Sequence, residues 1–151
     1  MTSDVATTEL HEAITARLRG VGLRYTHQRR RLVEILARSG NPVAMPEILR
    51  RGGLAQSSVY RNLNDLERAG VVRRLVTDEE HGRYELSEDL TEHHHHLICS
   101  NCGTVQDLPL PADFERRLQQ TLDRLARAVG FAEVSHRLDL IGLCASCAKG
   151  P

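Results

Sequence analysis

Residues 56–70 read QSSVYRNLNDLERAG, and this stretch decides the fold of the first half of the chain. Its apolar side chains recur at helical spacing and predict one buried face, formed by Val59, Leu63 and Leu66. Ser57 or Ser58 is the expected N-cap, because a serine hydroxyl accepts a hydrogen bond from the backbone N–H groups of a first turn. Gly70 is the expected end of the helix.

The sequence upstream predicts three more helices. The first ends near Gly20 and has apolar residues at helical spacing, namely Leu10, Ile14 and Leu18. Thr26 is the expected N-cap of the second, HQRRRLVEILARSG (27–40). The third, AMPEILRRGG (44–53), tolerates its proline in the first turn and is stopped by its two glycines. Together with residues 56–70, the third helix makes a helix-turn-helix.

A hairpin follows this motif. Residues 71–86, VVRRLVTDEEHGRYEL, alternate between apolar and polar on both sides of an acidic turn that contains glycine. Helices followed by a two-stranded wing define a winged helix, which lays the second helix of its motif in the major groove of DNA. A winged helix that binds another protein is the alternative.

The side of helix 56–70 opposite its apolar stripe is the expected DNA-reading surface. It comprises Ser57, Ser58, Tyr60, Arg61 and Asn62. Arg61 can pair with a guanine edge or a phosphate, and Tyr60 can pack on a thymine methyl group. Arg29 begins the basic run RRR (29–31) and is a further candidate for contact with double-stranded DNA. A solvated helix face is the alternative interpretation of such a run.

Composition and charge limit the remaining possibilities. The chain has 151 residues, of which 40% are hydrophobic and 3% aromatic, so it can bury a core but has few rings on which bases could stack. Residues 1–84 carry a net charge of +4 and residues 85–151 one of −4. A basic first half is suited to binding a polyanion, and an acidic second half to binding cations. A chance division of a neutral protein is the alternative. Because the sequence has neither an apolar run of membrane-spanning length nor the features of a signal peptide, we expect a cytoplasmic protein with no membrane partner.

The polar segment SEDLTE (87–92) lies where the charge changes sign, and we interpret it as a hinge. It separates a winged-helix domain (1–86) from a small domain (93–151). In the small domain, a strand HHHHLIC is followed by CGTVQDLPLP, a helix over residues 111–129 and a final strand pair around AEVSHRLDLIGLC. The helix has one apolar stripe, formed by Phe114, Leu118, Leu122, Leu125 and Val129. The predicted fold class is therefore α+β.

The cysteines can stabilise this small domain by binding a metal. They form two Cys-x-x-Cys pairs, Cys99 with Cys102 and Cys144 with Cys147. Two such pairs give the four thiolates of a tetrahedral zinc site, and a closed site of this kind stabilises a fold without catalysing a reaction. A reducing compartment favours metal ligation over disulfides. A thioredoxin-like redox pair is the alternative, and it accounts for only one of the two pairs.

Four consecutive histidines, His93 to His96, run directly into the first cysteine pair. In a β-strand alternate side chains share a face, so His93 and His95 point one way and His94 and His96 the other. One strand can thus supply two separate metal sites. A purification tag is disfavoured, because the run is internal and continues into an apolar strand. Exposed histidines without a metal are the other alternative.

Together these motifs resemble the ferric uptake regulator family of bacterial metal-dependent repressors. The resemblance runs from about Leu10 to Cys147 and rests on SSVYRNLNDLERAGVV, RYEL, HHHHLICSNCG and SHRLDLIGLCASC. It implies an N-terminal winged-helix DNA-binding domain, a small C-terminal α/β dimerisation domain and a structural Zn²⁺. It also implies a regulatory metal that closes a homodimer onto an A/T-rich inverted-repeat operator.

The resemblance further implies three metal sites. The structural zinc site matches Cys99, Cys102, Cys144 and Cys147. The second site, within the dimerisation domain, matches His93, His95, Glu115 and His136. The sensory site, at the domain junction, matches Glu85, His94 and His96. A histidine that usually completes the sensory site is replaced by Asn41-Pro42, and His81 in the wing is its nearest substitute. A solvated turn histidine is the alternative interpretation of His81.

The expected donors restrict the sensed metal. Since the cysteines are assigned to structural zinc, the sensory site has imidazole and carboxylate ligands, which suit Fe²⁺, Mn²⁺, Ni²⁺, Co²⁺ or Zn²⁺. Fe²⁺ is the leading expectation, with Zn²⁺ or Ni²⁺ as alternatives, because zinc sensors of the family often use a cysteine there and peroxide sensors an aspartate at the position of Glu85. A zinc hydrolase or a metal store is a remote alternative. The sequence has no His-Glu-x-x-His motif, so we expect no enzymatic activity.

Overall fold

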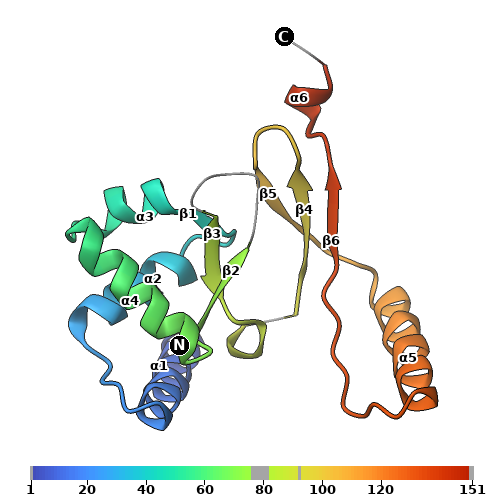
Figure 1. Cartoon of the computed structure of the whole chain (residues 1–151), viewed down its shortest axis with the longest axis horizontal. Coiled ribbons are helices and arrows are strands. Elements are labelled where there is room, and N and C mark those ends of the chain that lie inside the picture. Colours follow the sequence, from blue (N-terminus) through green and yellow to red (C-terminus); the bar gives the residue numbers. More distant parts are fainter. Residues whose placement is uncertain (1, 76–81, 92, 150–151) are drawn as a thin grey trace. The chain divides into compact units, whose positions relative to one another are not determined.

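A computed structural model describes residues 2–75, 82–91 and 93–149 of the chain. These residues form two compact units, Met1–His93 and His94–Pro151, each with its own three-stranded sheet (Figure 1). Among the described helices, there is no stretch with the length and apolar character that a bilayer span requires. The predicted α+β class is confirmed, with a winged helix first and a cysteine-containing unit after it.

Four helices make up most of the first unit: α1 (Thr2–Gly20), α2 (His27–Ala37), α3 (Met45–Gly52) and α4 (Gln56–Arg68). The apolar positions predicted to face inward are buried in one core, among them Ile14, Leu18, Val59, Leu63 and Leu66. Thr26 caps α2 as predicted, because its hydroxyl accepts a hydrogen bond from the Arg29 N–H. Gly53 (φ 60°) and Gly70 (φ 68°) follow α3 and α4 in the left-handed conformation that a residue without Cβ adopts readily. They explain the predicted helix ends.

The predicted N-cap of α4 is wrong. The helix already begins at Gln56, its N-cap is Ala55, and Ser57 and Ser58 lie inside the first turn. The turn that follows Gly53 is short, so the backbone is helical before the first serine is reached. The two serine residues are therefore at the N-terminal end of α4 without capping it.

The predicted wing is present as an antiparallel pair, β2 (Val72–Leu75) and β3 (Arg83–Leu86). A two-residue strand, β1 (Val43–Ala44), pairs with the other edge of β3 and is too short to be recognised from alternation. A 3-10 helix, η1 (Glu88–Leu90), follows the wing within the segment interpreted as a hinge. Residues 76–81, between these two strands, lie outside the described residues, and the predicted ligand His81 is among them.

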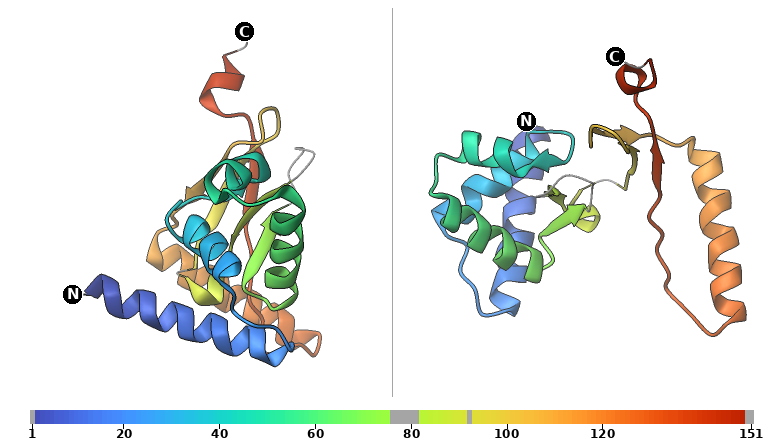
Figure 2. Two further views of the ribbon diagram at one scale, coloured as in Figure 1. Left: turned by 90° about the vertical axis from the view of Figure 1, so that its left-hand side faces the viewer. Right: turned by 45° about the horizontal axis from the view of Figure 1, so that its top comes forward.

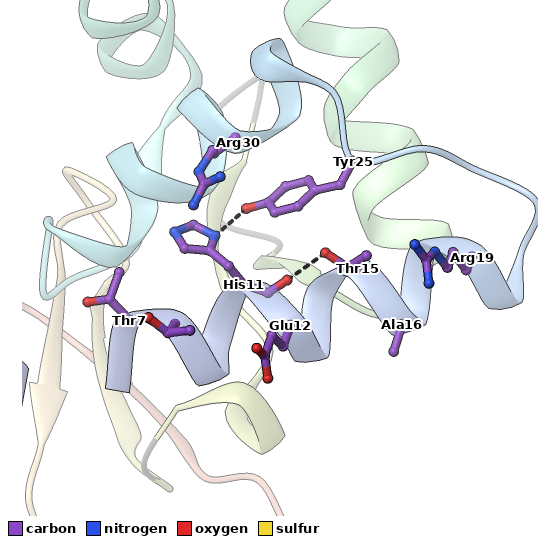
Figure 3. A pocket seen from close by; sticks show the side chains of 9 residues that line it. Thr7, His11, Glu12, Thr15, Ala16, Arg19, Tyr25 and Arg30 are labelled. Atoms are coloured by element: carbon purple, nitrogen blue, oxygen red, sulfur yellow. Dashed lines mark hydrogen bonds between the residues drawn. The ribbon is translucent and has the colours of Figure 1, made fainter. Parts of the chain in front are cut away.

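Helix α1 is joined to the loop before α2 through a pair of rings (Figure 3). The Nδ1 atom of His11 lies 2.7 Å from the hydroxyl of Tyr25, and Arg30 lies over the Tyr25 ring. Burial, followed by the positive charge of Arg30, lowers the pKa of His11, while burial raises the pKa of Tyr25. Both side chains are therefore uncharged, and the hydrogen bond between them fixes the loop that leads into α2.

The second unit contains β4 (His95–Cys99), β5 (Val105–Leu108), α5 (Ala112–Ala128), β6 (Asp139–Gly142) and α6 (Ala145–Ala148). Strand β4 is central, with β5 antiparallel on one edge and β6 parallel on the other. Figures 1 and 2 show α5 linked to β6 by an extended segment, residues 131–138, that returns beside the helix. Gln119 of α5 holds this segment, because its amide donates to the Val134 carbonyl over 3.0 Å.

Two predictions for this unit need correction. The expected final strand pair is a single strand, β6, among the described residues, because β4 has only two edges and β5 occupies one of them. The expected strand HHHHLIC begins at His95, so His93 and His94 precede it. The alternation of faces therefore applies to His95 and His96.

Candidate metal centres and DNA-contacting surface

The four cysteine side chains gather at one end of the second unit. Their sulfur atoms all lie within 4.8 Å of one another, and the Sγ atoms of Cys102 and Cys144 are 3.8 Å apart. In a tetrahedral site, Zn–S bonds of about 2.3 Å require sulfur atoms separated by about 3.8 Å. Cys99 ends β4, and Cys147 is brought to it by the parallel pairing of β6 and the turn into α6. The arrangement fits a metal site with four thiolates.

Backbone N–H groups favour the thiolate form of Cys99. Those of Cys102, Cys144 and Asn101 lower the pKa of Cys99 to about 6, and the Cys144 N–H lies 3.3 Å from its sulfur. Hydrogen bonding to Thr104 lowers the pKa of Cys102. Since thiolates and not thiols bind zinc, the turns that carry the cysteines predispose these two side chains to bind a metal.

Three residues converge at a second place in this unit. The Oε2 atom of Glu115 lies 2.9 Å from Nε2 of His95, and its Oε1 atom lies 2.8 Å from Nε2 of His136. The two imidazole rings are stacked, with centroids 5.2 Å apart. Two imidazole nitrogens and a carboxylate that face one another are a donor set for a first-row divalent metal. The fourth residue predicted for this site, His93, ends the first unit, where its Nδ1 atom lies 3.0 Å from Oε2 of Glu88.

Gln119 supports this cluster and was not predicted. Its Oε1 atom lies 2.7 Å from Nδ1 of His136. Its amide nitrogen donates to Asp123 and to the Val134 carbonyl, which fixes the oxygen as the atom that faces the ring. Nδ1 of His136 is therefore occupied by Gln119, and Nε2, 2.8 Å from Glu115, is the ring nitrogen that is placed to bind a metal. An amide on a helix gives no sequence signal for this role.

Asp139 is a second functional candidate that the sequence reasoning missed. It is the cross-strand partner of His96, and its Oδ1 atom lies 3.0 Å from Nδ1 of that ring. His96 is 1% exposed, and its ring makes an edge contact with His94 over 4.9 Å between centroids. A carboxylate that holds one imidazole nitrogen leaves the other available to a metal. The acidic residue in the apolar strand LDLIG is the signal that could have revealed it.

The remaining residue predicted for the sensory site, Glu85, lies on β3 of the first unit. Its side chain is 8% exposed and is paired with its cross-strand neighbour Arg73 over 2.5 Å. Glu85 and the pair His94 and His96 thus belong to different units, and their common ligation of one metal stays a prediction.

Only some of the side chains predicted to form the DNA-reading surface of α4 are exposed. Ser57 and Arg61 are exposed, whereas Ser58 and Tyr60 are half-buried and Tyr60 packs against the core. Asn62 is the correction: it is 6% exposed and does not face solvent. Its amide donates to the Ser58 carbonyl over 2.8 Å and to Gln28 over 3.2 Å, because this position of α4 faces α2.

Arg29 also differs from its predicted exposure. It is 9% exposed, and its guanidinium bonds the Arg24 carbonyl and Asp65 of α4. The residue lies on the side of α2 that packs against α4, so its charge is neutralised inside the unit. We therefore assign Arg29 a structural role, holding α4 against α2, in place of the predicted contact with DNA.

Other arginines form a basic groove that the sequence reasoning did not assemble. A hollow of about 310 Å³ is lined by side chains of α2, its C-cap and α3, namely His27, Arg30, Arg31, Glu34, Ile35, Arg38 and Arg51. Glu34 is the acidic member of this lining, and Arg30 lies 3.5 Å from it. A groove with an excess of guanidinium groups is suited to phosphate oxygens. Residues 30, 34 and 38 recur at helical spacing, which is the pattern that could have revealed it.

Comparison with known proteins gives a consistent result over almost the whole chain. The sequence model of the ferric uptake regulator family matches residues 20–141. The chain is 34% identical to the ferric uptake regulation protein of Bordetella parapertussis, covering 88% of this chain and 95% of that protein. It is 29% identical to the peroxide operon regulator of Bacillus subtilis, covering 96% and 97%. It resembles the structure of the Helicobacter pylori ferric uptake regulator, which is described as having three functional metal binding sites, with a TM-score of 0.70, 28% identity and 93% of each chain covered.

Proposed function

Because the chain belongs to the ferric uptake regulator family, we propose that it is a repressor that binds an A/T-rich inverted-repeat operator as a homodimer when Fe²⁺ occupies its sensory site. Members of this family are dimeric DNA-binding regulators that respond to metal. The chain is accordingly a metal-responsive transcription regulator and not an enzyme.

The observation that carries the proposal is the different environment of two neighbouring histidines. His95 faces Glu115, whereas His96 faces Asp139, because successive residues of β4 point to opposite sides. Each carboxylate can fix the orientation of its imidazole. Two separate imidazole sites on one strand are what a regulator with distinct sensory and structural metals needs.

The proposed sensory ligands are Glu85, His94, His96 and, in the wing, His81. Glu85 comes from the winged helix, and the two histidines come from the second unit. When these residues bind one divalent ion, the ion supplies a fixed link between the units. Glu85 and the histidines then favour one relative orientation of the winged helix, and DNA affinity rises by no more than the metal's own preference for that orientation.

The other two metal sites are proposed to be structural. Cys99, Cys102, Cys144 and Cys147 hold Zn²⁺ in a closed set of thiolates, which contributes to folding. His93, His95, Glu115 and His136 hold a second metal that stabilises the packing of α5 and the segment before β6 against β4. A change in this second site is therefore expected to alter affinity for DNA without removing the response to metal.

The choice of Fe²⁺ rests on the donors that remain when the cysteines are assigned to zinc. Imidazole and carboxylate groups suit Fe²⁺, and they also accept Zn²⁺ or Ni²⁺, which are the second candidates. The similarity to a peroxide operon regulator adds a further branch of the family. By the family resemblance, peroxide sensors have an aspartate at the position of Glu85. The glutamate in this chain therefore makes peroxide sensing less favoured.

We assign DNA contact to the exposed N-terminal end of α4 and to the basic groove lined by α2 and α3. Arg61 and Ser57 are exposed near the N-terminus of α4, a position from which a recognition helix reads base edges. In the groove, Arg31 of α2 and Arg38, the C-cap of that helix, are exposed and are proposed to bind backbone phosphates. Tyr60, which is half-buried on α4, is also proposed to contact DNA.

Exposed apolar side chains of the second unit support the homodimer. Phe114, Leu125 and Val129 lie on the predicted stripe of α5 and are 44, 59 and 73% exposed. On β6, Ile141 is 74% exposed. Apolar patches of this kind are expected to be covered in solution, and a second copy of the chain is the occupant that family membership favours.

The test of this function is binding to a labelled palindromic DNA under anaerobic conditions. We expect tight binding with Fe²⁺ and at least about tenfold weaker binding when the sensory metal is removed by a chelator that leaves zinc in place. Equal binding with and without metal contradicts the proposal. If Zn²⁺ or Ni²⁺ increases DNA affinity more than Fe²⁺ does at the same free metal concentration, that metal replaces Fe²⁺ as the proposed sensed ion.

A further inference from the structure

Arg73 of β2 lies between two carboxylates of the first unit. Its Nε and Nη2 atoms lie 2.9 and 2.5 Å from Oε1 of Glu85, its cross-strand partner. Its Nη1 atom lies 3.2 Å from Oε1 of Glu88, on η1. The side chains of Arg73 and Glu85 are 12 and 8% exposed, so this pair is poorly screened by water. Arg73 is thus a buried cation whose charge is shared by two acceptors.

One of these acceptors is a predicted ligand of the sensory metal. A guanidinium and a divalent ion make the same demand on a carboxylate, since both need its oxygen lone pairs and its negative charge. Both hydrogen bonds from Arg73 go to Oε1 of Glu85, so a metal that takes this oxygen displaces them. A metal on either oxygen also places a second positive charge beside a guanidinium that cannot lose its proton. The contact therefore opposes metal binding.

Glu88 makes the displacement feasible. Its Oε1 atom is buried and lies 3.2 Å from Nη1 of Arg73, while its Oε2 atom is engaged by His93. When Arg73 gives up Glu85, Glu88 remains as its counter-ion, so the guanidinium is not left as an isolated buried charge. The three side chains can then exist in two arrangements, with Arg73 shared between two carboxylates or held by Glu88 alone.

We propose that Arg73 is an internal competitor of the regulatory metal at Glu85, with Glu88 as the acceptor that retains it, and that this competition sets the metal concentration to which the protein responds. The inference rests on the proposed role of Glu85 as a sensory ligand. It assigns opposite effects to two residues: Arg73 weakens metal binding, and Glu88 strengthens it.

The test measures Co²⁺ affinity of the full-length dimer loaded with zinc, by competition with a chromophoric chelator and by the d–d absorption of the bound ion. We expect R73M to bind Co²⁺ at the sensory site about tenfold more tightly, because hydrogen bonds to a charged group are lost only from the metal-free form. E88Q is expected to bind severalfold more weakly. R74M removes the same charge from the next residue of β2 and is the matched control with unchanged affinity.

The remaining outcomes are decided by two further variants. If R73M does not fold, R73K keeps a charge but cannot form the same pair of bonds, and its affinity is expected to lie above that of the wild type. Unchanged or weaker binding in a folded R73M or in R73K overturns the proposal. E85Q separates this failure from that of the proposed function: if E85Q retains full sensory-site affinity, Glu85 is not a ligand and the proposed site itself is wrong.

Discussion

The Oδ1 atom of Asp139 lies 3.0 Å from Nδ1 of His96, its partner in the parallel pairing of β4 and β6. The bond fixes a ring that is 1% exposed and directs its other nitrogen away from β6. Asp139 is therefore the residue of the second unit best placed to orient a sensory imidazole. It links the strand order of the sheet to the chemistry of the proposed site.

Replacement of Asp139 is expected to weaken the metal response without loss of the fold. D139A removes both the charge and the acceptor, and we expect a loss of about 10- to 100-fold in sensory-site affinity. D139N keeps an acceptor and is expected to lose less. D107N is the matched control, since Asp107 is the exposed partner of His96 on the opposite edge of β4. Equal effects of D139A and D107N in a Co²⁺ titration rule out the orienting role.

Loss of one thiolate is expected to open the cysteine site. C99S removes the sulfur that the backbone N–H groups of neighbouring turns stabilise, and structural zinc contributes folding free energy on the order of 10 kcal/mol in small domains. We expect less than stoichiometric zinc and a lower melting temperature of the second unit. S146A, between the second pair of cysteines, serves as the control. Full zinc content and an unchanged melting curve in C99S disprove a four-cysteine site.

Arg61 and Asn62 are adjacent in sequence, yet their replacements are expected to differ. R61A removes an exposed guanidinium and is predicted to weaken operator binding by about 1–3 kcal/mol with unchanged stability. N62A removes buried hydrogen bonds to Ser58 and Gln28 and is predicted to destabilise the fold by about 1 kcal/mol. R68A, at the other end of α4, is the control for charge. Urea melts and DNA titrations of the three variants are the measurements, and loss of binding by R68A equal to that by R61A would place the reading surface elsewhere.

Arg29 provides a direct comparison between a structural and a DNA-contacting arginine. R29A leaves Asp65 without its partly buried partner and frees the Arg24 carbonyl, so we expect a loss of about 2 kcal/mol in the free energy of unfolding. R31A, on an exposed face of the same helix, is expected to keep its stability and to reduce the salt dependence of DNA binding. A stable R29A with impaired DNA binding contradicts the structural role.

Much of the fold follows from local pattern. The apolar spacing of α4, the cap at Thr26 and the glycines after α3 and α4 are local signals, and each predicted element that depends on them is present. Features that need a tertiary partner were not predictable in the same way. The burial of Asn62 and Arg29 depends on the angle at which α2 crosses α4, and the roles of Asp139 and Gln119 depend on which segments return beside β4 and α5. A basic residue at the start of a helix, such as Arg29, therefore does not by itself identify a contact with DNA.

The candidate metal residues divide in the same way. The cysteine pairs carry their spacing in the sequence, and their four sulfur atoms do meet. The histidine run gave the correct opposition of His95 and His96, because it depends only on strand geometry. It did not reveal that Arg73 already engages Glu85, since this cross-strand pair is set by the register of the wing.

The division of the histidines into a sensory pair and a structural pair is the central claim, and one titration tests it most directly. Operator binding is measured against Fe²⁺ under anaerobic conditions, and against Zn²⁺ and Ni²⁺ separately, for the H94A/H96A and H93A/H95A double variants. We predict that H94A/H96A loses metal-dependent binding while it remains a zinc-loaded dimer, and that H93A/H95A binds more weakly but still responds to metal. Equal loss of the metal response in both variants contradicts the account.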